Sequence, residues 1–183
     1  MSDKVILVLQ YLQNVVGIER GHAPLDFQNI GDIPPFWAGN GEPPPLKEIK
    51  SNHIVCVGLT NLARRKVGLE IPGNITGEEK SDFPGGTLEW FKYLNSRNWL
   101  EDIDFNKQYP DGTMLIWDFN QRDQGHVAII YKSNIDLLSS EIIHSFNNSK
   151  KDKGVVIEKL TNYKKCKNFT HICLPIYWLE GNK

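Results

Sequence analysis

One cysteine and two histidines are the residues of this chain best suited to nucleophilic chemistry. Cys56 falls in the first turn of a predicted helix, whose apolar positions follow helical spacing over residues 54–65. A thiol there lies at the positive end of the helix, beside backbone N–H groups that have no partner within the helix. Both features stabilise the thiolate, which is the nucleophilic form of cysteine. We therefore expect Cys56 to be a nucleophile or, as free cysteines often are, a small buried core residue.

His126 and His144 can supply the base and the orienting group that such a nucleophile needs. His126 begins a predicted strand over residues 126–131, and His144 lies in the middle of a predicted strand over 141–146. If these strands pair as a hairpin, the two imidazoles can lie side by side on one face. One imidazole can take a proton at neutral pH, and a second can orient the first. The set predicts a cysteine hydrolase triad that acts through an acyl-enzyme.

Other roles remain open for these residues and their neighbours. Two histidines and a cysteine could ligate zinc, but no C-x-x-C or H-x-x-x-H spacing supports this, so we expect no metal and no cofactor. Asn52 is the expected N-cap of the cysteine helix. His53 could line an oxyanion site or serve in capping or at the surface. Trp37 and Trp117 are further candidates for contacts with a substrate.

The first half of the chain is predicted to be helical and the second half to form an antiparallel sheet. Residues 21–45 contain six prolines and should be irregular, either as a wall of an active cleft or as a wrapping arm. We expect one α+β domain over residues 1–183, with an N-terminal helix and this proline-rich arm in 1–50. Helices are expected over 4–16, 54–67 and 87–97, and strands over 113–119, 126–131, 141–146, 154–159 and 171–176.

Composition and charge argue against several functions. The net charge is -1 and no basic stripe is present, so we expect no nucleic-acid partner. No apolar run reaches the roughly 18 residues of a membrane helix, and no segment has the features of a signal peptide. Three scattered cysteines indicate a reducing compartment such as the cytoplasm and no disulfide framework, although Cys166 and Cys173 could pair.

Four motifs carry a resemblance to a known family. They are Cys-x-Gly-Leu at the start of the cysteine helix, Pro-Asp-Gly-Thr-Met-Leu-Ile-Trp at 110–117, Gly-His-Val-Ala-Ile-Ile-Tyr at 125–131 and Ile-Ile-His-Ser at 142–145. In this order they resemble the NlpC-type cysteine peptidases, papain-like enzymes that cut peptides of bacterial cell walls. The resemblance covers residues 54–146. It implies a papain-like fold, an amide bond of a peptidoglycan-type stem peptide as substrate, and Cys56, His126 and His144 as nucleophile, base and third member.

The chain also departs from the pattern of that family. The family usually has Asp-Cys-Ser-Gly, whereas Val55 and Val57 flank the cysteine here. No tyrosine lies between Tyr11 and Tyr93, although the family commonly places one upstream of the cysteine. The resemblance therefore implies the catalytic machinery more firmly than the wall-peptide specificity. Residues 73–111, which include the extra predicted helix, look like an insertion.

CHAP-type amidases are nearly as similar, and in them the third group is usually a carboxylate or an amide. Glu141, Asn147 and Asn148 are the candidates for that role here. We prefer His144 because a mid-strand position fixes the orientation of a side chain. Two other functions stay open, namely acyl transfer at the same site and a catalytically inactive binding or structural module.

Overall fold

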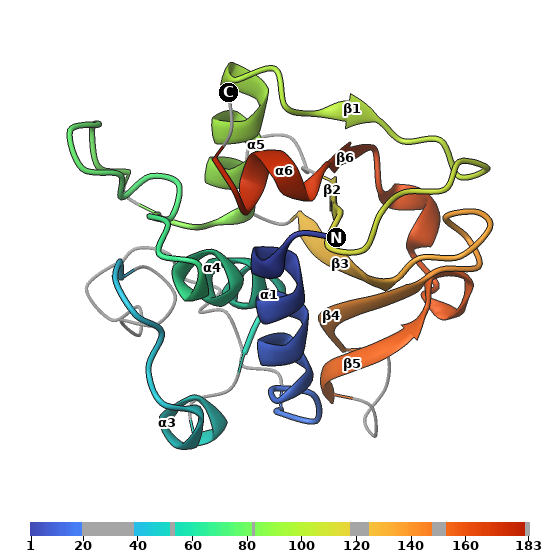
Figure 1. The fold of residues 1–183 in the computed structure, drawn as a ribbon, viewed down its shortest axis with the longest axis horizontal. Helices are drawn as coiled ribbons and strands as arrows, with labels where there is room; N and C mark the ends of the chain where they lie inside the picture. Colours follow the sequence, from blue (N-terminus) through green and yellow to red (C-terminus); the bar gives the residue numbers. More distant parts are fainter. Residues whose placement is uncertain (20–38, 52–53, 82, 118–124, 148–152, 182–183) are drawn as a thin grey trace.

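The computed structural model describes residues 1–19, 39–51, 54–81, 83–117, 125–147 and 153–181 (Figure 1). These residues form helices on one side of a six-stranded sheet. The helices are α1 (Asp3–Gln13), α3 (Leu46–Ser51), α4 (Cys56–Lys66), α5 (Thr87–Ser96) and α6 (Pro175–Trp178), with short 3₁₀ turns η2 (Leu160–Asn162) and η3 (Cys166–Asn168). The strands are β1 (Glu101–Asp102), β2 (Met114–Trp117), β3 (His126–Lys132), β4 (Glu141–Asn147), β5 (Lys153–Lys159) and β6 (His171–Cys173).

The sheet is antiparallel throughout its described pairs, in the order β1-β6-β2-β3-β4-β5. Alternate residues of β2, β3, β4 and β6 enter or pack against two different apolar clusters, so this part of the sheet is buried on both faces. In β3, for example, Val127 and Ile129 join one cluster, whereas Ala128 and Ile130 join the other. The combination of helices and an antiparallel sheet confirms the predicted α+β class.

One face of the sheet is covered by helices. Figure 1 shows α1 and α4 side by side, and α4 packs against β3 and β4. The buried Asn61 connects α4 to its surroundings, because its amide donates to Gly85 O at 3.2 Å and accepts from Trp90 Nε1 at 2.8 Å. Buried polar groups need such partners, so Asn61 fixes how α4 and α5 meet.

The other face is covered by aromatic side chains and by the turns that follow β5. Tyr163 and Phe169 are almost fully buried there, together with Leu160 at the start of η2. In the part of the chain that the structure describes, this face carries no helix longer than one turn, and the aromatic rings cover it because they bury large areas. The candidate histidines lie on this face.

The structure corrects several boundaries predicted from the sequence. The N-cap of α4 is Val55, and Asn52 lies outside the described residues. The last strand ends at Cys173 and Pro175 begins α6, because the fixed φ of proline and its missing N–H suit the first turn of a helix. Most of the proline-rich arm lies outside the described residues.

Residues 73–111 pack into the same core as the rest of the chain. Their helix α5 contributes Trp90 and Leu94 to the helix-side cluster, and β1 pairs with β6. Among the described residues, no helix combines the length and apolar character needed to cross a bilayer.

Candidate active site

The structure joins His126, His144 and Glu158 in one chain of hydrogen bonds. His126 Nε2 lies 2.9 Å from His144 Nδ1, and His144 Nε2 lies 2.9 Å from Glu158 Oε1. The three residues come from the adjacent strands β3, β4 and β5. The register pairs Ile142 with Glu158 and His144 with Val156, so the carboxylate reaches the imidazole along a diagonal on one face.

The carboxylate determines which nitrogen carries the proton along this chain. An ionised carboxylate only accepts hydrogen bonds, so His144 Nε2 is the donor to Glu158. A neutral imidazole has one N–H, so His144 Nδ1 is an acceptor and His126 Nε2 donates to it. The remaining lone pair of a neutral His126 is then on Nδ1, which is the nitrogen able to accept a proton from another group.

Aromatic rings surround the two imidazoles. Trp117 lies 5.1 Å from His126 and Tyr163 lies 4.8 Å from His144 between ring centroids, and Phe146 stacks on His144 with planes 5° apart. The relative exposures of His126 and His144 are 5% and 0%. In such an apolar surrounding the hydrogen bonds between the histidines and the carboxylate are stronger than they would be in water.

Cys56 is the first residue of α4, as the sequence predicts, and it belongs to the cluster on the helix side of the sheet. Ser145, the neighbour of His144 in β4, donates a hydrogen bond to the carbonyl of Ile54 at 2.5 Å. This bond holds the start of α4 against the end of β4. Because β4 is antiparallel to β3, that end lies beside the start of β3, where His126 is located. Cys56 and His126 therefore occupy the same end of the sheet.

Cys56 belongs to the cluster on the helix side of the sheet, whereas the two imidazoles pack against Tyr163 of the cluster on the other face. A contact between Cys56 and His126 has to pass the end of β3, which His126 begins. Gly125, the residue before His126, is tightly packed. A Cβ at this position would lie 2.3 Å from Trp117 O and 2.4 Å from Thr87 Cγ2. The absence of a side chain at Gly125 lets the start of β3 lie close to β2 and α5.

The structure places only some of the other predicted site residues near the histidines. Trp117 is 5% exposed and packs on His126, so it forms a wall of the imidazole and offers little surface to a substrate. Glu141 lies at the opposite end of β4 from the contact between His126 and His144. Trp37, His53 and Asn148 lie outside the described residues, as does the side chain of Asn147.

Glu158 is the residue of this site that sequence reasoning did not find. It lies next to the last residue of β5, between Ile157 and Lys159, where a glutamate is ordinarily a solvated side chain. Its role depends on the pairing of β5 with β4, which sets it within reach of His144. The signal available in the sequence was a carboxylate in a strand predicted to join the sheet of the histidines.

The described residues contain no group of three or more His, Cys, Asp and Glu side chains arranged to hold a metal ion. The three cysteines are free thiols, so Cys166 and Cys173 do not pair. Burial raises the pKa of the Cys173 thiol to about 12. Comparisons of the chain with protein-family models, curated proteins and solved structures found no match.

Proposed function

We propose that this protein is a cysteine hydrolase of papain-like arrangement that cleaves an amide bond. Cys56 is the nucleophile, His126 the general base, and His144 the group that orients the base. The observation that supports the proposal most is the hydrogen-bonded chain from His126 through His144 to Glu158, located at the end of the sheet where α4 begins. A base fixed by a third group is the arrangement that activates a nucleophile.

The proposed reaction has two steps. Cys56 Sγ bonds to the substrate carbonyl carbon while its proton passes to His126 Nδ1, and His126 then gives that proton to the leaving amine as the C–N bond breaks. Water next attacks the acyl-enzyme, with His126 taking one proton from the water and returning it to the sulfur. Backbone N–H groups in the first turn of α4 would stabilise the developing oxyanion, since the first N–H groups of a helix have no acceptor within the helix itself.

For the substrate we propose a peptide of the bacterial cell-wall type, on the basis of the motif resemblance. Purified peptidoglycan incubated with the protein should release fragments that mass spectrometry detects. A Cys56→Ala variant should release none, whereas a Cys166→Ser variant should act like the wild type. If neither the wild type nor the Cys166→Ser variant releases fragments while Cys56 reacts rapidly with a thiol probe, the substrate class is wrong and the hydrolase proposal stands.

An inactive binding or structural module is the second candidate, because the segment around the cysteine is buried. Ile54, Val55 and Val57 are at most 7% exposed and Cys56 is 8% exposed. The rate of Cys56 alkylation by iodoacetamide as a function of pH separates the two candidates. An activated thiol reacts with an apparent pKa well below the ordinary value of about 8.5, whereas a structural thiol does not.

A further inference from the structure

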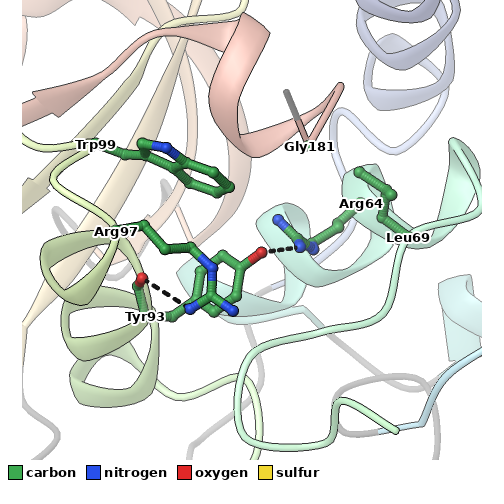
Figure 2. A pocket seen from close by; sticks show the side chains of 6 residues that line it. All are labelled: Arg64, Leu69, Tyr93, Arg97, Trp99 and Gly181. Carbon is green, nitrogen blue, oxygen red and sulfur yellow. Dashed lines mark hydrogen bonds between the residues drawn. The ribbon is translucent and has the colours of Figure 1, made fainter. Parts of the chain in front are cut away.

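A hollow of about 490 Å³ lies away from the candidate active site, between the C-terminal half of α4 and the end of α5 (Figure 2). Its size is within the range of small-molecule sites. Arg64 lies eight residues along α4 from Cys56, which is about 12 Å at the rise of an α-helix. The hollow is therefore separate from the cysteine. Its lining residues are Arg64, Leu69, Tyr93, Arg97, Trp99 and Gly181.

Arg64 is a buried cation whose hydrogen-bond partners are all uncharged. It is 4% exposed and donates to the backbone carbonyls of Glu70 and Trp178, and to the hydroxyl of Tyr93. These three bonds leave two of its five N–H groups without an acceptor in the part of the chain that the structure describes. A buried charge without an opposite charge is costly, so this guanidinium is suited to receive an anion.

The side chain of Glu70, whose backbone carbonyl accepts from Arg64, is directed elsewhere. The Glu70 carboxylate accepts hydrogen bonds from the backbone N–H of Thr76 at 3.0 Å and from its hydroxyl. These bonds, with a smaller contribution from Arg64, lower the pKa of Glu70. Glu70 therefore remains ionised, yet its carboxylate is held by Thr76 instead of pairing with Arg64.

A second guanidinium contacts the same aromatic ring. The Arg97 Cζ atom lies 3.9 Å from the Tyr93 ring centroid and the Arg64 Cζ atom lies 4.7 Å from it. Arg97 also pairs with Glu78 at 2.9 Å, but both side chains are substantially exposed, so this ion pair is weak and exchangeable. The described lining of the hollow contains two cations and no carboxylate. Figure 2 shows the indole of Trp99 over the same space.

We propose that this hollow binds a small ligand that carries a carboxylate or phosphate group on a flat ring. The anionic group would bind Arg97 and the remaining N–H groups of Arg64, since guanidinium matches the geometry of both oxyanions. The ring would lie against the small exposed part of Trp99 that lines the hollow, since this indole is 8% exposed and is itself held by stacking on Tyr177 at 5.7 Å. This inference is independent of the proposed hydrolase activity.

Isothermal titration calorimetry of the full chain tests the proposal with benzoate, phenyl phosphate and, as a neutral control, phenol. We expect at least one of the two anions to bind and phenol not to bind. Arg97→Met should weaken the anion about tenfold or more, because a charge-assisted hydrogen bond contributes about 1.5–3 kcal/mol. Lys92→Met is the matched control, since Lys92 is a 61% exposed cation on the same helix, and it should leave the affinity unchanged.

Two results would overturn the proposal. The first is the absence of binding by both anions at concentrations of about 10 mM, which is weaker than useful recognition. The second is equal weakening by Arg97→Met and Lys92→Met, which would show general attraction by surface charge. Inorganic phosphate tests the ring contact separately. It should bind the wild type more weakly than phenyl phosphate does, whereas a Trp99→Ala variant should bind the two ligands with equal affinity. Thermal melts of each variant establish that it is folded before its affinity is compared.

Discussion

The hydrogen bond from His144 to Glu158 gives the sharpest test of the proposed mechanism. In the wild type the carboxylate fixes His144 with its proton on Nε2, and His126 in turn with its proton on Nε2. The amide of a Glu158→Gln variant can either accept or donate a hydrogen bond, so it no longer selects one tautomer. When the amide donates, the proton order reverses and His126 Nδ1 is protonated, so it cannot act as the base.

The size of the effect follows from the kinds of hydrogen bond exchanged. A bond to a charged acceptor contributes about 1.5–3 kcal/mol and a bond to a neutral acceptor about 0.5–1.5 kcal/mol. Exchanging the charged acceptor for a neutral one therefore costs the difference between these two contributions. Because the Glu158 side chain is 20% exposed, we take the low end of that difference, about 1 kcal/mol. With 1.36 kcal/mol per factor of ten, the reactive fraction falls about fivefold. Glu158→Leu removes the acceptor altogether and should lower it about tenfold or more.

The assay is the rate of Cys56 alkylation by iodoacetamide across a range of pH, in a Cys166→Ser background. Cys173 does not interfere near neutral pH, since burial raises the pKa of its thiol to about 12. Glu141→Gln removes the same charge from a residue of β4 that neighbours Ile142, the partner of Glu158, but whose side chain lies on the opposite face of the sheet, so it should leave the profile unchanged. The reasoning is refuted if Cys56 of the wild type reacts as an activated thiol and both Glu158 variants react at the wild-type rate at every pH. The carboxylate would then not act through the histidines.

Three further predictions concern the framework of the molecule. Gly125→Ala would set its Cβ 2.3 Å from Trp117 O, so we expect about 1–3 kcal/mol of destabilisation in urea unfolding and slower alkylation of the cysteine. Asn61→Ala leaves the buried Trp90 Nε1 without its acceptor and should lower the free energy of unfolding by about 1–3 kcal/mol, whereas an unchanged urea midpoint would contradict the role of this amide. Burial raises the pKa of Tyr11 from 10.0 to about 12, so the unfolded chain loses this proton first and stability should fall as the pH rises through that interval. Tyr11→Phe should make this alkaline loss of stability smaller, which urea midpoints measured at several pH values can establish.

Local sequence patterns predicted most of the secondary structure. Apolar spacing in α1 and α5 and short apolar runs rich in β-branched residues in β3 and β4 are properties of short segments, so the residue order alone indicates them. The predicted strand over 171–176 was too long because Pro175 favours the start of a helix as much as the edge of a strand. Strand β1 has two residues and only its pairing with β6 defines it, so no local pattern could indicate it.

The candidate site was predicted in part. The sequence placed Cys56 at the start of a helix and indicated that His126 and His144 could share a face, and the structure brings the two imidazoles together. It did not indicate that their face is opposite the cluster that contains Cys56. Trp117, a predicted candidate for contacts with a substrate, packs against His126, because a residue at the end of a strand can point into either layer.

The sequence by itself determined the types and order of the elements and the positions of the cysteine and the histidines within them, because helical and strand periods depend on neighbours a few residues apart. Only the tertiary structure decided the partners of those residues. A slip of one residue between β4 and β5 would turn Glu158 to the other face, so strand register makes it the partner of His144. Likewise, Arg64 and Arg97 come together through the packing of α4 against the C-terminal segment and α5, which are remote from α4 in sequence.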